Sequence, residues 1–125
     1  IHAGMAWMQE KAPNAEWLVS LASDTPFFPT HFVDALLTEA NASSRKLAIA
    51  ASKLQVHPVF ALWHISLKTH IEAQLSTGEA PRLQEWMMAH NPVQVDFNAD
   101  AYDPFFNINT PQDLYAAEPM SALVK

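Results

Sequence analysis

The sequence predicts an α/β protein in which helices pack on a mostly parallel sheet. Short apolar runs that suit strands alternate with segments in which apolar residues recur every three or four positions, as they do on a helix. Half of the residues are hydrophobic and only 16% are charged, a composition that favours a packed core over disorder. The length of 125 residues suits one domain, so residues 1–125 are expected to form a single unit.

The chain is expected to open with a helix, because Ile1, Met5 and Met8 recur at helical spacing. Residues 16–22 follow as a near-continuous apolar run, which is typical of a strand buried on both faces. A second helix is indicated after Thr30, a residue type that caps helices. Its apolar positions are spaced by four residues: Phe32, Leu36 and Ala40.

Two further strands are predicted near the middle of the chain, at residues 47–51 and 56–63. Pro58 lies within the second run, and because proline has no backbone N–H it requires an edge position, a bulge or a strand start. The two runs could form a hairpin, or the second strand could begin just after Pro58.

The second half of the chain predicts three helices and one strand. Ser66 and Gly78 suit the start and the end of a helix, and Pro81 suits the first turn of the next one. Residues 93–97 alternate apolar and polar side chains, as a strand does. A last short helix is expected at residues 111–117, after a hydroxyl cap and a proline.

Composition also restricts the classes of function and location. The net charge is −6 with seven Lys and Arg together, which argues against a nucleic-acid-binding face. The chain has no cysteine, so it has no disulfide, thiolate metal site or cysteine nucleophile, and this fits a reducing compartment such as the cytoplasm. No apolar run approaches the length of about 20 residues that a membrane helix needs. We therefore expect a cytoplasmic protein without nucleic-acid or membrane partners.

Glycine is scarce, and this bears on nucleotide binding. Gly4 and Gly78 are the two glycines of the sequence. A loop that cradles phosphate groups normally contains several glycines, because the backbone must approach the phosphates closely. If the protein handles a nucleotide, the main phosphate loop is expected to lie outside these residues.

Asp24 is the first candidate site residue. It closely follows the apolar run at residues 16–22, and in open α/β sheets ligands bind beyond the carboxyl ends of the strands. Aspartate is also common in turns, and from this residue alone a role in the turn is the better supported explanation.

Histidine and asparagine supply the other polar candidates. The six histidines show no metal-ligand spacing, so a zinc site is not favoured, and His57 beside Pro58 is interpreted as structural. Asn107 and Asn109 flank Ile108, and at a spacing of two residues both amides would point to the same side of a strand. Such a pair can recognise a polar ligand, although turn chemistry before a helix is the better supported explanation from spacing alone.

Four stretches, taken in order, resemble a known family: AGMAW, SDTPFFP, HPVFALW and FFNINTPQDL. The chain resembles the C-terminal two-thirds of a molybdenum cofactor guanylyltransferase, of the molybdopterin-guanine dinucleotide biosynthesis protein A family. The resemblance covers nearly all of the chain. It implies a three-layer α/β/α Rossmann-like nucleotidyltransferase fold with the N-terminal part missing. It also implies Mg²⁺-dependent transfer of GMP from GTP to molybdopterin, with release of pyrophosphate.

The same resemblance suggests roles for particular residues. It assigns Asp24 to the magnesium ion and the GTP phosphates, as the catalytic carboxylate. Asn107 and Asn109 are assigned to the molybdopterin side of the cleft, and Arg82 matches a basic position that contacts substrate. The spacing from Gly78 to Trp86 is one residue longer than the family pattern. The family's glycine-rich motif, LAGGxSxRMGxDK, is absent, so these residues alone are expected to be inactive.

Two other functions stay open at this point. One is a related cytidylyltransferase or sugar nucleotidyltransferase, which nucleotide competition on the full-length protein would distinguish. The other is a non-catalytic interaction module that associates with another chain, such as a second copy, through the open edge of a truncated sheet.

Overall fold

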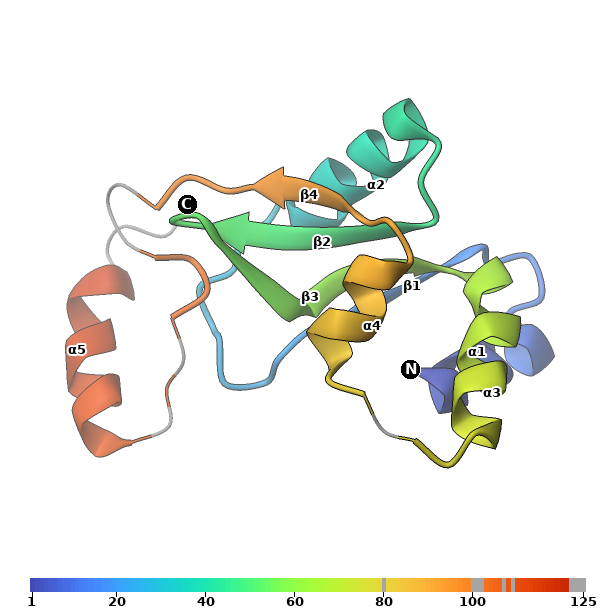
Figure 1. The fold of residues 1–125 in the computed structure, drawn as a ribbon. Coiled ribbons are helices and arrows are strands. Elements are labelled where there is room, and N and C mark those ends of the chain that lie inside the picture. The colour runs from blue at the N-terminus through green and yellow to red at the C-terminus, as the bar shows by residue number, and fades with distance from the viewer. Residues whose placement is uncertain (80, 100–102, 107, 109, 122–125) are drawn as a thin grey trace.

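The computed structural model describes residues 1–79, 81–99, 103–106, 108 and 110–121 (Figure 1). Asn107 and Asn109, two of the candidate site residues, lie outside the described residues. Helices and strands alternate along most of the chain, as the sequence predicts. In order, the elements are α1 (His2–Lys11), β1 (Trp17–Ser20), α2 (Phe32–Ser43), β2 (Leu47–Ser52), β3 (Gln55–His64), the 3₁₀ turn η1 (Ile65–Leu67), α3 (Lys68–Ser76), α4 (Leu83–Ala89), β4 (Val93–Asp96) and α5 (Pro111–Ser121).

The strands form one mixed sheet in the order β1-β3-β2-β4. β3 is antiparallel to both β1 and β2, whereas β4 is parallel to β2. It follows that β1, β2 and β4 all run in one direction and that their carboxyl ends lie at the same edge of the sheet. Figure 1 shows the arrowheads of β2 and β4 pointing toward α5 at this edge.

β2 and β3 form a hairpin, one of the two arrangements that the sequence left open. Pro58 lies inside β3, and the register explains how it is accommodated. Ile49 pairs with Ala61 and the next residue, Ala50, pairs with His57, so residues 58–60 bulge out of the ladder. The missing N–H of proline therefore interrupts no rung of the sheet.

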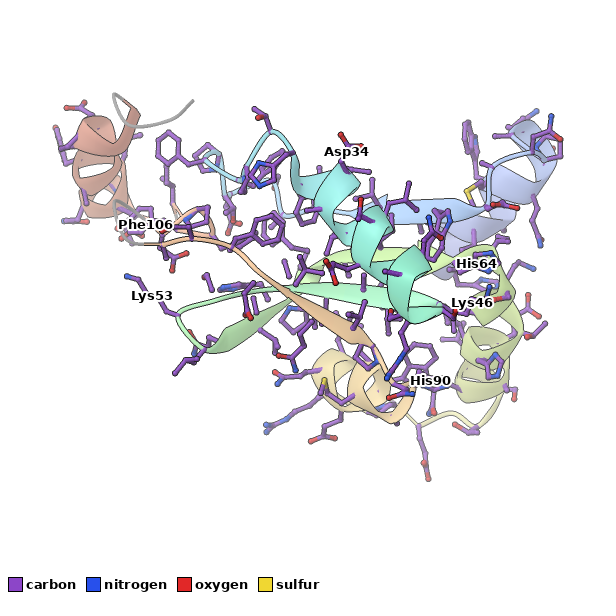
Figure 2. The ribbon with its side chains drawn as sticks, turned by 90° about the horizontal axis from the view of Figure 1, so that it is seen from above. Asp34, Lys46, Lys53, His64, His90 and Phe106 are labelled. Carbon is purple, nitrogen blue, oxygen red and sulfur yellow. The ribbon has the colours of Figure 1, made fainter. Side chains whose placement is uncertain are left out.

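Helices cover both faces of the sheet, so the expected three-layer α/β/α arrangement is confirmed. α2 packs on one face, and Figure 2 shows it lying across the strands. The core between α2 and the sheet contains Phe32, Leu36, Ala40, Ala48, Ala50, Phe60, Leu62, Val95, Phe97 and Phe105. α1 and α4 pack on the other face together with η1. That core contains Met5, Leu47, Ile49, Ala61, Trp63, Leu67 and Met87.

The first strand is not the buried strand that its apolar run predicts, and this expectation is wrong. β1 is four residues long and lies at the edge of the sheet, with β3 as its neighbour in the described part of the chain. Val19 is 38% exposed and Leu21, just beyond the strand, is 45% exposed. β2 instead is buried along its whole length. An apolar run indicates a strand, but its position in the sheet depends on which strands pair with it.

Two helix ends differ in how well they were predicted. The prediction that Ser66 caps a helix is wrong. At the start of η1 the Nδ1 of His64 accepts the Ser66 backbone N–H at 3.1 Å, so the His64 side chain supplies the cap. α5 begins as expected with a reciprocal pair, in which the Thr110 hydroxyl and the Asp113 carboxylate each accept the other's backbone N–H at 3.1 Å. Among the described residues, no helix is long and apolar enough to cross a membrane.

Candidate functional site

Asp24 lies beyond β1, at the edge where β2 and β4 also end. Its side chain is half-buried, and its Oδ1 accepts a long hydrogen bond of 3.3 Å from the hydroxyl of Thr25. Its backbone carbonyl accepts a 2.7 Å hydrogen bond from the N–H of Ile108. This bond joins the loop after β1 to the segment that precedes α5, two stretches that are far apart in the sequence.

Ser52, His57 and Asp103 meet at the same edge of the sheet. Ser52 is the last residue of β2 and is only 2% exposed. Its hydroxyl donates to Oδ1 of Asp103 at 3.0 Å and lies 2.7 Å from Nε2 of His57. The same carboxylate oxygen accepts the N–H of Phe105 at 3.0 Å, and the His57 ring stacks on the Phe105 ring with centroids 4.5 Å apart.

Figure 2 makes the two ends of the sheet visible. Lys53, in the turn between β2 and β3, and Phe106 lie at one end, whereas Lys46 and His64 lie at the other. The turn at Lys53 directly follows Ser52, so the buried hydroxyl belongs to the first end. The candidate site therefore occupies the carboxyl edge of β1, β2 and β4.

The sequence did not identify Ser52 or Asp103 as site residues. They are 51 positions apart, and no local motif connects them. His57 stood out because Pro58 follows it, and its interpretation as a structural residue agrees with its stacking and its hydrogen bond.

Burial lowers the pKa of the His57 imidazole below its ordinary value of 6.5, and it outweighs the nearby carboxylate of Asp103, which raises this pKa. The folded state therefore binds a proton at His57 less readily than the unfolded chain does. His57 contributes stability above pH 6.5, and this contribution is lost as the pH falls through the lowered pKa of the folded state.

This pKa shift predicts a pH dependence of folding. Between pH 8 and pH 5, wild type should lose more unfolding free energy than His57→Gln, measured by urea denaturation at each pH. His70→Gln, on an exposed position of α3, should follow wild type. Burial also lowers the pKa of His64, but that group is common to all three proteins and cancels in the comparison. An identical slope for wild type and His57→Gln would contradict the assignment.

Arg82 stands apart from this edge cluster. It occupies the position before α4 in an extended conformation, and its side chain is exposed. With Gln84, Glu85 and Met88 it lines a shallow hollow. Within the described part of the chain, no hydrogen bond or ion pair connects Arg82 to Asp24 or to residues 103–106 and 108.

Besides Asp24, two described carboxylates lie at or near this edge: Asp96, the last residue of β4, and Asp103, which already accepts from Ser52 and Phe105. Among the residues that the structure describes, no group of three His, Cys, Asp or Glu side chains could enclose a metal ion. Within the described part of the chain, Asp24 keeps acceptor capacity, because the donor to its carboxylate there is the Thr25 hydroxyl, at 3.3 Å from one of the two oxygens. Such a site suits Mg²⁺, which binds one or two carboxylates and fills its other positions with water and phosphate oxygens.

Comparisons with known proteins agree with this fold. The family model described as "MobA-like NTP transferase domain" matches residues 1–93. The molybdenum cofactor guanylyltransferase of Rhizobium johnstonii is 40% identical over 123 residues, which are 94% of this chain and 58% of that protein. The enzyme of the same name from Nitrobacter hamburgensis is 33% identical over 98% of this chain and 59% of its own length. The chain thus spans somewhat less than three-fifths of these curated relatives.

Solved structures show the same fold. Molybdopterin-guanine dinucleotide biosynthesis protein A from Archaeoglobus fulgidus superimposes with a TM-score of 0.66 at 23% identity, over 95% of this chain and 63% of that one. A protein from Aquifex aeolicus VF5 gives the same TM-score at 17% identity, over 87% of this chain and 56% of its own. The family match covers more than half of the described sequence, and the curated relatives extend it to nearly all of the chain. The chain belongs to the MobA-like NTP transferase domain family.

Proposed function

We propose that the full-length protein transfers GMP from GTP to molybdopterin and releases pyrophosphate, and that residues 1–125 are the C-terminal portion of its single nucleotidyltransferase domain. The curated relatives that carry the guanylyltransferase name support this activity. The observation that carries the proposal is the 2.7 Å bond between Ile108 N–H and the Asp24 carbonyl. It brings Ile108 to the SDTP loop at one edge of the sheet, where α/β proteins bind ligands.

The reaction proposed is an in-line attack. A phosphate oxygen of molybdopterin forms a bond to the α-phosphorus of GTP while the bond to the leaving pyrophosphate breaks. Transfers of this kind depend mainly on positioning and on charge neutralisation. The carboxylate of Asp24 would hold Mg²⁺ beside the GTP phosphates, where the ion supplies positive charge against the triphosphate. Asn107, Asn109 and Arg82 are proposed to contact the molybdopterin substrate.

The phosphate-binding loop is proposed to lie in the part of the relatives' length that this chain does not span. Gly4 is inside α1 and Gly78 follows the end of α3 with a φ of +74°, so neither is part of a glycine-rich loop. GTP is supplied in the cytoplasm, which is where we propose that the reaction occurs.

The test is a guanylyl-transfer assay. The full-length protein should release pyrophosphate from Mg²⁺–GTP when molybdopterin is present, and excess CTP should not compete. The isolated 125-residue chain should release none under the same conditions. Preferential use of CTP would identify a cytidylyltransferase, and turnover by the isolated chain would contradict the assignment of the phosphate loop.

The exposed edge of β1 also supports self-association of the 125-residue chain. Val19, in β1, and Leu21, just after it, are exposed, and among the described residues β1 pairs with β3 alone, which leaves its other edge open to pairing. We expect sedimentation equilibrium to show a concentration-dependent dimer that Val19→Lys weakens. Val33→Lys, at a similarly exposed position on α2, is the control and should leave the dimer intact. A monomer at all concentrations would contradict this prediction.

A further inference from the structure

The hydrogen-bonded group of Ser52, His57 and Asp103 has no part in the proposed reaction, yet it is among the most buried polar features of the described chain. Ser52 is one of two buried polar or charged residues there, the other being Thr25. A buried hydroxyl is unfavourable unless it is hydrogen-bonded, and Ser52 has partners on two different segments. The arrangement therefore links the end of β2 both to β3 and to residues 103–106.

The direction of the hydrogen bonds excludes a nucleophilic role for this group. An ionised carboxylate only accepts, so the single proton of the Ser52 hydroxyl goes to Asp103. The Ser52 oxygen must then accept from N–H at Nε2 of His57. In a hydrolytic triad the histidine instead accepts the proton of the serine. Here the serine is a bridge between the two other side chains.

The bridge fixes the turn that follows Asp103. The Asp103 carboxylate accepts the backbone N–H of Phe105, which closes the turn on itself. The Phe105 ring is 4% exposed, stacks on His57 and lies against Phe60 and Phe97 at centroid distances of 4.8 and 5.6 Å. Three residues further along, Ile108 N–H binds the Asp24 carbonyl. The segment before α5 is thus attached to β2, to β3 and to the loop after β1.

We propose that Ser52, His57 and Asp103 are positioning residues for this segment. By fixing residues 103–106 at the carboxyl edge, they set the register in which Ile108 meets Asp24. In the sequence Ile108 lies between Asn107 and Asn109, the residues proposed to bind molybdopterin, so we expect the network to affect the binding of that substrate. This last step rests on the proposed function, whereas the attachment of the segment does not.

The attachment can be tested in the 125-residue chain without any substrate. Amide hydrogen exchange by NMR reports the Ile108 N–H directly, and the Ile49 amide in the centre of the sheet reports global opening. Ser52→Ala should lower the protection of Ile108 about tenfold or more relative to Ile49, because it leaves two polar side chains without their bridge. Unchanged protection of Ile108 would overturn the proposal.

Two further variants separate positioning from general destabilisation. Ser66→Ala is the matched control, since it removes a Ser–His bond of the same 2.7 Å length, to His64 at the opposite end of the sheet. It should leave Ile108 protected. Asp103→Asn keeps an oxygen that can accept from both Ser52 and Phe105, so it should retain most of the protection that Asp103→Ala loses. If Ser52→Ala fails to fold, the protection of Ile108 is compared between Asp103→Asn and Asp103→Ala instead, since Asp103 is a half-buried loop residue.

The functional step has its own readout in the full-length enzyme. Ser52→Ala should raise the KM for molybdopterin several-fold and leave the KM for GTP unchanged, with Asp103→Asn close to wild type. If the enzyme transfers GMP normally and neither KM changes, the network does not position substrate. If wild type does not transfer GMP to molybdopterin at all, the proposed function fails while the exchange result still decides the attachment.

Discussion

Replacing Asp24 with alanine in the full-length enzyme should reduce guanylyl transfer about a hundredfold or more, which is typical when a transition-state charge loses its stabilising partner. The proposal gives this carboxylate the task of holding Mg²⁺ beside the phosphates. The fold should persist, because among the described residues the half-buried side chain has one long bond, to Thr25, and the contact with Ile108 uses the backbone carbonyl. Steady-state pyrophosphate release and circular dichroism measure the two effects separately.

Two control variants make this result specific. Asp24→Asn keeps the shape of the side chain and an acceptor for Thr25 but loses the negative charge, so it should be nearly as inactive as alanine. Asp34→Ala removes an acidic residue from the first turn of α2, on the outside of the molecule (Figure 2), and should keep full turnover. It should lower stability only by about 0.3–1 kcal/mol, through the lost interaction with the helix dipole. Retained turnover in Asp24→Asn would show that the charge is not required.

Local sequence patterns were sufficient for the fold class but not for the place of each strand. Apolar periodicity identified β2, β3 and β4 and the helices that cover them, because burial of one face imposes a spacing that can be read in the sequence. The run at residues 16–22 was misjudged as a doubly buried strand. Its position at the edge is decided by pairing with β3, and such pairing between distant segments leaves no signal in the run itself.

The candidate site also combines a feature that the sequence predicts with contacts that it does not predict. The position of Asp24 at this edge could be predicted, since a residue just after a strand falls at the ligand-binding edge of an α/β sheet, whereas its role in metal binding stays a prediction. The contact of Asp24 with Ile108 could not be predicted, because it joins backbone groups 84 positions apart through a loop that has no periodic pattern. Ser52 looks like any strand-end serine until Asp103 is brought to it. Contacts of this kind arise from the tertiary fold alone.

The largest loss of stability is expected from replacing Trp63, which lies on the face of the sheet away from α2. Its side chain is 1% exposed within the core formed with α1 and α4, and its Nε1–H donates to the hydroxyl of Ser20 at 3.0 Å. Trp63→Ala should lower the free energy of unfolding by about 3–5 kcal/mol, because it removes the largest buried side chain and leaves a cavity. Urea denaturation followed by circular dichroism measures this loss.

The contribution of the indole N–H can be separated from that of the ring. Ser20→Ala removes the acceptor and leaves a buried donor unpaired, so it should cost about 1–3 kcal/mol while the ring stays in place. Trp7→Ala is the matched control, since that indole is 62% exposed and its loss should change stability by no more than about 0.5 kcal/mol. Ser20 is the last residue of β1, and Asp24 follows four positions later. The bond from the Trp63 indole to the Ser20 hydroxyl therefore also holds the end of the strand that precedes Asp24. A Ser20→Ala variant as stable as wild type would show that β1 is held by its backbone pairing with β3 alone.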